Sequence, residues 1–525
     1  MASSGLLLAL RQADETLTAS FDCAFAAENN PWRHLGALAI LCLTISVVTG
    51  IVAFALYDTS VSGAYQSGLR LQQDPLLLGR LLRGLHRYAA DGFMLLTILH
   101  LLRESARGHF AGVRWFSWLT GIPLVWMLWI AGITGLWLLW DQRALFSVTA
   151  TAEWLQALPL SSDLLARNFL TSIALNDRFF SLIMFMHIGV PLLLIGGVWI
   201  HVQRLSKVRF WPPRALVAGS LAMFVLLALL VPAESLGRAD TGHVAATLSL
   251  DWFYLFPHPL VSELSAGAGW LLAVGLTLLL AALPLLPRKP DTIPLRAAQV
   301  DLANCNGCSR CAADCPFDAV VMIARTDQRN HPRQASVIED RCAACGICVG
   351  ACPSSTPFRS IEDMVSGIEL PATPVADLRR QLQTRLVALT VSPKIMLFSC
   401  RQAADLSAIE DRATAVMPLE CAAMLPPSFI EYALRLGADG ALVSGCRAAD
   451  CEYRLGDRLV RDRFDGVREP RLRAAAPRER IAMAWTGNDA VRTRQAVHAL
   501  RAKVAALARP VDTYPESLQE EMHHD

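Results

Sequence analysis

The sequence predicts a helical membrane bundle followed by two smaller domains of mixed α and β structure. Three observations lead to this prediction. The long apolar runs lie between residues 35 and 286. Two cysteine runs of equal spacing follow them, CNGCSRCAADCP at 305–316 and CAACGICVGACP at 342–353. From about residue 385, strand-like segments alternate with amphipathic helical ones, which is typical of an α/β domain.

The composition agrees with a membrane protein. Hydrophobic residues make up 53% of the 525 residues, charged residues make up 18%, and the mean hydropathy is +0.37. Soluble proteins usually carry about 25% charged residues. The net charge of +2 is too small to favour nucleic acid as a partner, so membrane lipid is the expected surrounding.

Six segments are expected to cross the membrane. Residues 1–34 precede them as a lead-in, and residues 1–30 are too polar for a signal peptide, which favours an amphipathic helix at the membrane surface. Each segment has about 18–26 residues, enough to cross roughly 30 Å of hydrocarbon. The expected spans are 35–57, 80–104, 115–140, 179–203, 215–232 and 267–286.

The charges of the connecting loops set the expected orientation. Basic segments follow the second, fourth and sixth spans, with the sequences RESARGHFAGVR, QRLSKVRFWPPR and PRKPDTIPLR. Lys and Arg prefer the cytoplasmic side of a membrane. The N-terminus and everything after residue 287 are therefore expected on the cytoplasmic side of a bacterial inner membrane. The loops at 58–79, 141–178 and 233–266 are expected to face outward.

Composition also divides the rest of the chain. The membrane domain is expected at 35–286, and a Pro-rich segment after it reads as a linker. The further expected parts are the linker at 287–296, a double-cysteine-run domain at 297–365, a connector at 366–384, an α/β domain at 385–470 and a charged helical tail at 471–525.

Four histidines share one spacing within two of the expected spans. His86 and His100 are fourteen residues apart, as are His187 and His201. Fourteen residues return a side chain to within about 40° of the same helix face and move it about 21 Å along the axis. Parallel helices then place His86 level with His187 and His100 level with His201, so each level offers two nitrogens to one haem iron. The alternative is polar packing, which is less favoured because ionisable groups in bilayers are costly and tend to be functional.

Four glycines follow the same period. Gly36 and Gly50 lie in the first span, and Gly121 and Gly135 lie in the third, each pair fourteen residues apart. Glycine pairs alone indicate helix packing in membranes. Their shared period with the histidines favours a second interpretation, in which a missing side chain at each level lets a porphyrin ring approach the backbone.

Residues 31–260 resemble the cytochrome b subunit of cytochrome bc complexes. The paired histidines and glycines carry this resemblance, together with GLWLLWDQ at 135–142, which is similar to the family's G-x4-W-G-Q, and DWFYLF at 251–256, which is similar to its P-E-W-Y. The resemblance implies a helical bundle with two stacked b haems, and the dimeric family implies a homodimer. The implied ligands are His86 and His187 for the outer haem, and His100 and His201 for the inner haem.

The resemblance also implies roles for three charged residues. Arg103, three residues after His100, matches the arginine that pairs with an inner haem propionate, and Arg83 is expected to act likewise at the outer haem. Asp251 falls where the family has the Glu that takes a quinol proton. Leu250 and Asp251 replace the family's Pro and Glu, and six spans are expected against its eight. The alternative for Asp251 is an ordinary interfacial carboxylate.

The two cysteine runs predict two 4Fe-4S clusters. In C-x2-C-x2-C-x3-C-P, three thiolates bind one cluster and the fourth binds the other. Zinc and disulfides are less favoured, because zinc knuckles need neither the third Cys nor the following Pro. The region resembles bacterial two-cluster ferredoxins. The expected ligands are Cys305, Cys308, Cys311 and Cys352 for cluster one, and Cys342, Cys345, Cys348 and Cys315 for cluster two.

Four further cysteines lie in the α/β region: Cys400, Cys421, Cys446 and Cys451. Four thiolates suit a 2Fe-2S cluster or a zinc ion, and plain buried thiols are a third alternative. Residues from about 390 to 460 resemble the delta subunit of methyl-viologen-reducing hydrogenases. That resemblance implies a 2Fe-2S cluster that passes electrons to a flavoprotein partner.

These cofactors predict a membrane electron-transfer subunit of a quinone oxidoreductase. A cytoplasmic flavoprotein dehydrogenase, of the heterodisulfide-reductase or NAD(P)H-linked type, is expected to dock on residues 385–525. Electrons then pass through the 2Fe-2S and 4Fe-4S clusters to the two b haems and on to quinone. In one alternative, quinol is oxidised near Asp251 and electrons run inward to a low-potential acceptor. In another, the chain is a membrane anchor with structural haems.

Overall fold

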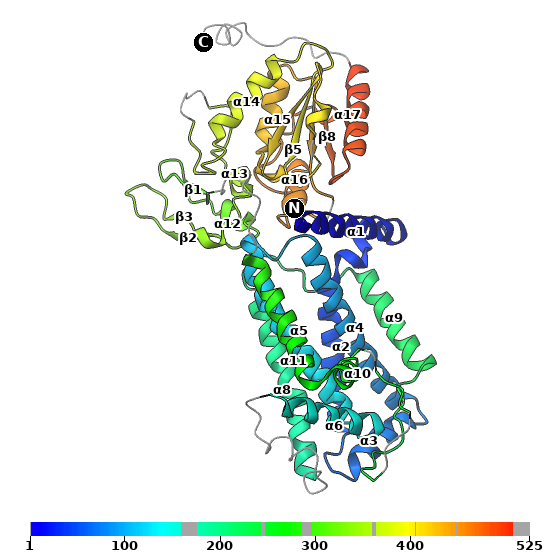
Figure 1. The fold of residues 1–525 in the computed structure, drawn as a ribbon. Coiled ribbons are helices and arrows are strands. Elements are labelled where there is room, and N and C mark those ends of the chain that lie inside the picture. Colours follow the sequence, from blue (N-terminus) through cyan, green and yellow to red (C-terminus); the bar gives the residue numbers. More distant parts are fainter. Residues whose placement is uncertain are drawn as a thin grey trace. The chain divides into compact units, whose positions relative to one another are not determined.

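The chain folds into two compact units, Met1–Lys289 and Pro290–Asp525 (Figure 1). The computed structural model describes residues 2–158, 176–242, 247–251, 253–285, 296–359, 364–404, 406–447 and 450–507. Several expected segments lie partly outside these ranges. They are the linker at 287–296 except its last residue, the end of the tail at 508–525, and parts of the loops at 141–178 and 233–266.

A helix lies at each of the six expected spans. These helices are α2 (Leu35–Ala55), α4 (Leu78–Ala106), α5 (Trp115–Trp137), α8 (Asp177–Val202), α9 (Arg214–Leu230) and α11 (Ala266–Ala282). Among the described residues, four segments are long and apolar enough to cross a membrane by length and composition: Leu35–Ala55, Gly112–Trp137, Asp177–Val202 and Ala266–Leu285. The helix α9 has only 17 residues, and α4 carries charged side chains such as Arg87 and Asp91.

Two helix pairs form the centre of the first unit. The helix α2 packs along α4, and α5 packs along α8, while α9 contacts α4 and α11 contacts α5. The shared core is aromatic and aliphatic, with Phe180, Ile183 and Tyr254 fully buried. Burying such side chains contributes about 1.5–3 kcal/mol each.

Four shorter or amphipathic helices surround this centre. The lead-in contains α1 (Ala2–Phe25), in agreement with the helix predicted there. The loops expected to face outward contain three further helices, α3 (Gly63–Gln72), α6 (Gln142–Gln156) and α10 (Pro257–Leu264). Asp141 caps α6, because its side chain accepts a hydrogen bond from the backbone N–H of Ala144.

The second unit begins with two short antiparallel strand pairs. The strand β1 (Gln299–Val300) pairs with β4 (Ile368–Glu369), and β2 (Val320–Ala324) pairs with β3 (Arg333–Val337). Each cysteine run ends in a one-turn helix. These helices are α12 (Arg310–Asp314) and α13 (Ile347–Ala351), and they pack against each other.

A four-stranded parallel sheet forms the rest of the second unit. Its strand order is β6 (Thr414–Leu419), β5 (Ile395–Cys400), β7 (Gly440–Ser444) and β8 (Ile481–Ala484). The helices α14 (Val375–Val387), α15 (Pro427–Arg435), α16 (Gly456–Phe464) and α17 (Ala490–Ala505) accompany it. The sheet continues past residue 470, where the sequence predicts a domain end, because β8 pairs with β7 and α17 packs on β7.

The strand order creates a switch point in this sheet. From β5 the chain moves to β6 on one side and then to β7 on the other. At such a point, the loops after the strands diverge and leave a crevice at the carboxyl edge of the sheet. Cys400 ends β5, Cys421 follows β6 and Cys446 follows β7, so three of the four cysteines of this domain lie at that edge.

Candidate redox centres

The four histidines of the membrane unit form two pairs between α4 and α8. The ring centres of His86 and His187 are 6.2 Å apart, and the rings are inclined by 71°. Two imidazoles on opposite sides of one metal ion, with bonds of about 2 Å, would place their ring centres roughly 6 Å apart. His100 and His201 are neighbours as well. The structure therefore brings together the two pairs that the spacing predicts.

Each of the four glycines faces one histidine across a helix pair. A Cβ atom added at Gly50 would lie 3.0 Å from the Cε1 atom of His86, and one at Gly135 would lie 2.8 Å from that of His187. The corresponding distances are 3.2 Å from Gly121 to His201 and 3.7 Å from Gly36 to His100. A methyl group at Gly135 would collide with the ring of His187, and one at Gly50 would require the ring of His86 to shift by a few tenths of an ångström. Glycine at these positions thus sets how closely each histidine approaches the neighbouring helix.

Three histidines bond to the backbone of the neighbouring helix. The Nδ1 atom lies 2.9 Å from a carbonyl oxygen for His86 and 3.0 Å for His187, and His201 makes a similar bond. A carbonyl only accepts, so Nδ1 carries the proton and Nε2 is left with a lone pair for a metal. The partner carbonyls and flanking threonines are Ser46 and Thr49 for His86, Ala131 and Thr134 for His187, and Ser117 and Thr120 for His201.

The sequence contains a signal for these bonds that the histidine spacing alone does not reveal. In each case, the threonine stands directly before the glycine and the carbonyl belongs to the residue four positions before it. The Thr–Gly pairs at 49–50, 120–121 and 134–135 mark the three positions at which a histidine bonds to the neighbouring helix. Leu35 precedes the fourth glycine, Gly36, so this position lacks the hydroxyl.

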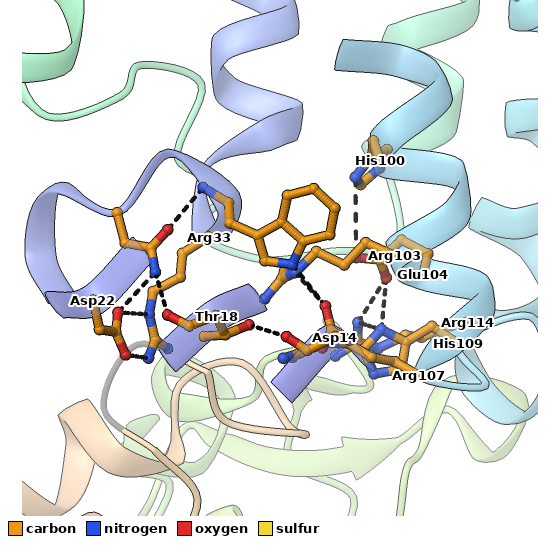
Figure 2. Close-up of polar contacts among 12 residues, drawn as sticks. Asp14, Thr18, Asp22, Arg33, His100, Arg103, Glu104, Arg107, His109 and Arg114 are labelled. Carbon is orange, nitrogen blue, oxygen red and sulfur yellow. Dashed lines mark hydrogen bonds and ion pairs between the residues drawn. The ribbon is translucent and has the colours of Figure 1, made fainter. Parts of the chain in front are cut away.

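His100 has a different neighbour. Its Nδ1 atom lies 4.0 Å from Glu104 Oε1, one turn further along α4 (Figure 2). The other oxygen of Glu104 is 2.6 Å from His109 Nδ1 and 3.4 Å from Arg114 Nη1. One of the four histidines is therefore linked to a group of ionisable side chains rather than to the backbone.

A second polar group fastens α1 beside this end of α4. The buried Asp14 carboxylate accepts hydrogen bonds from Trp32 Nε1 at 2.7 Å and Arg107 Nε at 2.8 Å, and Arg103 Nε lies 3.4 Å away (Figure 2). Arg103, which the resemblance assigns to a haem propionate, is thus also a partner of Asp14. The carboxylate is surrounded by donors, as a buried charge requires.

Arg83 lies one turn before His86 on α4 and is bound by groups of the first unit. Its guanidinium donates to Gly68 O at 3.2 Å, to Gln72 Oε1 at 3.0 Å and to Ser235 Oγ at 2.8 Å. These contacts connect α4 to α3 and to the segment after α9. Arg83 is thus close to His86 in the sequence, but its guanidinium forms hydrogen bonds with groups of the protein.

Asp251 closes a buried turn. Its Oδ1 atom accepts hydrogen bonds from the N–H groups of Phe253 at 3.0 Å and Tyr254 at 3.1 Å, and its Oδ2 atom pairs with Arg87. Trp252, the next residue, lies outside the described ranges. These contacts match the alternative interpretation of Asp251 as a structural carboxylate more closely than that of an available proton acceptor.

The cysteines expected for cluster one line a single hollow. Cys305, Cys308, Cys311 and Cys352 all border it. Burial raises the pKa of the Cys311 thiol to about 12. A thiolate at this place therefore requires a nearby positive charge such as a metal centre.

The cysteines expected for cluster two are also neighbours. The charges of Cys342, Cys345 and Cys315 all act on Cys348, whose pKa is raised chiefly by burial. The Cys315 sulfur accepts a hydrogen bond from the N–H of Ala319 at 3.3 Å. Hydrogen bonds of this kind tune the potential of iron–sulfur clusters.

The last four cysteines form a closed ring of contacts. Cys400 hydrogen-bonds to Cys421 and Cys446, and Cys451 hydrogen-bonds to the same two residues. Hydrogen bonds from its two partners lower the pKa of Cys400 to about 4. The four sulfur atoms thus lie close together at one edge of the sheet.

Comparison with known families identifies three domains in this chain. Residues 22–209 match cytochrome b/b6/petB, residues 304–356 match the 4Fe-4S dicluster domain, and residues 396–508 match the methyl-viologen-reducing hydrogenase delta subunit. The chain therefore contains these domains in that order, as the sequence predicts. The family match to residue 508 agrees with a sheet that continues past residue 470.

Individual proteins are similar to the first part of this chain. Cytochrome b of Arabidopsis thaliana is 25% identical over 283 residues, which cover 48% of this chain and 71% of the relative. Cytochrome b of Zea mays is 27% identical over 180 residues, which cover 34% and 45%. A chain of a hyperthermophilic respiratory Complex III aligns with 20% identity and a TM-score of 0.41, covering 49% of this chain and 75% of that chain.

These matches define the general class of the protein. It is a membrane protein with a cytochrome b domain, which implies haem b, and with iron–sulfur domains that follow it. This combination indicates membrane electron transfer.

Proposed function

We propose that this chain is a membrane subunit that carries electrons from a cytoplasmic flavoprotein to the quinone pool. Two b haems would bind at His86 with His187 and at His100 with His201. The observation that carries this proposal is the His86–His187 pair, with ring centres 6.2 Å apart and each Nδ1 atom bonded to a carbonyl. Both Nε2 atoms are thereby left as metal ligands, which a packing role does not require.

The iron–sulfur unit would supply the cytoplasmic part of the path. The hollow lined by Cys305, Cys308, Cys311 and Cys352 supports the ligand set proposed for cluster one. The neighbouring set of Cys315, Cys342, Cys345 and Cys348 supports cluster two. When bound, these centres accept and donate single electrons, whereas the protein supplies the ligands, the spacing and the potentials.

The four-cysteine site of the α/β domain would hold the 2Fe-2S cluster. Its support is the ring of contacts among Cys400, Cys421, Cys446 and Cys451 at the edge of the sheet. Gly456 makes room for this ring, because a Cβ atom there would lie 2.5 Å from Cys421 Sγ and 2.9 Å from Cys451 Sγ. Replacing Gly456 with Val should therefore remove the 2Fe-2S signal and leave the 4Fe-4S signals intact.

The proposed topology has six spans with the N-terminus and the iron–sulfur unit on the cytoplasmic side of a bacterial inner membrane. The basic segments after α4, α8 and α11 support this orientation. A flavoprotein dehydrogenase, heterodisulfide-reductase-like or NAD(P)H-linked, would dock on the α/β domain, and two copies of the chain would form a dimer. Reporter fusions would test this topology, with a fusion after α4 expected on the cytoplasmic side of the membrane and a fusion after α9 expected on the outer side.

The contacts of Asp251 favour quinone chemistry at the inner level. The Asp251 carboxylate pairs with Arg87 and accepts hydrogen bonds from two N–H groups. We therefore propose that Asp251 stabilises its turn. Replacing Asp251 with Asn should leave quinone turnover largely intact. Loss of turnover with normal haem content would instead favour quinol oxidation at the outer face.

One measurement decides between the two directions of electron flow. The purified protein is titrated under anaerobic conditions and followed by optical and EPR spectra. We expect two b haems with potentials near that of quinone, and iron–sulfur clusters with lower potentials. Clusters at or above the haem potentials would reverse the direction. Absence of any haem band would refute the histidine assignment.

A further inference from the structure

A buried arginine joins the two iron–sulfur domains of the second unit. Arg463 lies on α16 of the α/β domain, and its side chain is 1% exposed. It pairs with Asp314 of α12, whose side chain is also 1% exposed, at 2.7 Å. A buried charge is tolerated only when its partners are well placed, so this contact holds the two domains in one arrangement.

Each partner of this arginine lies next to a proposed cluster ligand. Asp314 immediately precedes Cys315. The guanidinium also donates to Ile347 O at 3.3 Å, directly before Cys348, and to Ala423 O at 2.8 Å, two residues after Cys421. One side chain therefore touches two segments that carry cluster-two ligands and one segment of the four-cysteine site.

Other contacts between these two domains are also close. The helix α13, which contains Cys348, packs against the 3-10 turn Ala422–Met424. A Cβ atom at Gly350 would lie 2.1 Å from Ala423 O and 2.6 Å from Arg463 Nη1, so only glycine fits this junction. Arg454, three residues after Cys451, donates to Pro316 O at 2.7 Å, and Pro316 directly follows Cys315.

Cluster two also lies between the other two sites in terms of helix packing. The helix α13, which contains Cys348, packs against α12, which contains Cys311 of the cluster-one set. It also packs against the turn Ala422–Met424, which directly follows Cys421 of the four-cysteine site. Cys308 of that set is exposed, whereas Cys345 and Cys348 are buried.

We propose that Arg463 is a positioning residue that fixes the order of electron exchange within this unit. The order runs from the four-cysteine site to cluster two and then to cluster one. Each exchange moves one electron, so that one centre is oxidised as its neighbour is reduced. This inference rests on the proposed function, because it requires clusters at all three cysteine sites.

The experiment uses the full chain with its clusters, reduced and examined by EPR. Iron and acid-labile sulfide are measured first. Replacing Arg463 with Met should preserve cluster content but weaken the magnetic interaction between the four-cysteine centre and its neighbour. It should also slow electron exchange between them at least about tenfold. The matched control is Arg458→Met, because Arg458 lies on the same helix, its side chain is exposed, and it pairs with Asp462 of that helix.

Two cysteine variants test the order independently of Arg463. Replacing Cys345 with Ala should abolish the magnetic interaction of the four-cysteine centre, whereas replacing Cys308 with Ala should leave it unchanged. The reverse result would overturn the proposed order, and wild-type behaviour of Arg463→Met would overturn the role of that residue. If the wild-type protein lacks clusters by iron and sulfide analysis, the proposed function fails first, which is a separate result.

Discussion

The two histidine levels of the membrane unit differ in what surrounds them. At the first level, His86 and His187 both bond to backbone carbonyls and face glycines that stand directly after threonines. At the second level, only His201 has these features, while His100 faces Glu104 and its charged neighbours. The histidines of the first level are therefore held by contacts with the backbone of neighbouring helices, whereas His100 of the second level also contacts a group of ionisable side chains. Steric changes should act on the first level, and charge changes should act on the second.

The largest expected effect on haem content is steric. Replacing Gly135 with Leu should remove the haem proposed at His86 and His187, because even a Cβ atom there would lie 2.8 Å from His187. Overpacking of this kind costs about 1–3 kcal/mol or more. Haem content of the purified protein should fall from two towards one, with the second level retained. The matched control is Gly275→Leu, where a Cβ atom has open space. Equal loss of haem at both levels would show that steric changes do not act on the first level alone.

The next effect concerns the attachment of α1. Replacing Asp14 with Asn should release α1, because the change leaves Arg107 and Arg103 without their buried carboxylate partner. Removing one member of a buried ion pair costs about 3–5 kcal/mol. Limited proteolysis in membranes should show faster cleavage within α1. Asp22→Asn is the control, because Asp22 pairs with Arg33 but is 24% exposed. Equal protection of both variants would show that Asp14 does not anchor the helix.

A smaller effect is expected from a change of charge at the second level. Replacing Glu104 with Gln removes a negative charge 4.0 Å from His100 Nδ1. A nearby charge shifts a redox potential by on the order of tens of millivolts at protein dielectric. The potential of the haem at His100 and His201 should rise, while that of the other haem stays constant. Equal shifts at both haems in an optical titration would contradict the separation of the two levels.

The smallest effect should come from the threonines. The Thr134 hydroxyl is 3.4 Å from His187 Nδ1 and also donates to Ile130 O at 2.8 Å. The carbonyl of Ala131 remains the closer partner of His187, so Thr134→Val should cost at most about 1 kcal/mol of stability. Haem content should be unchanged, with only a small shift in the EPR g-values of that haem. Loss of the haem would show that the hydroxyl, and not the carbonyl, orients the ring.

Much of the architecture could be predicted from periodicity and spacing. The six long helices follow from apolar length, and the placement of two histidines on one face of each helix follows from their fourteen-residue spacing, because both are local properties of the sequence. The family comparisons confirm the three domains and their order. The number of haems, the membrane orientation and the ligand assignments stay predictions.

Other features depend on contacts between distant segments. The strand β8 has four residues and no long apolar run, so it is recognised only through its pairing with β7. The helices α3 and α6 lie in loops whose sequence is not strongly apolar, and they are stabilised by packing on the bundle. Arg463 lies 149 residues from Asp314 in the chain, so its role follows only from the folded arrangement.

The attachment of α1 has a consequence for the order of biosynthesis. Arg107 is synthesised 93 residues after Asp14, its hydrogen-bond partner. At translation rates of about 5–20 residues per second, Asp14 waits roughly 5–20 s before this partner has been made. During that time, the first helix has its carboxylate in water or among lipid headgroups. Docking of α1 through this contact is therefore expected only after α4, which contains Arg103 and precedes Arg107, has been made.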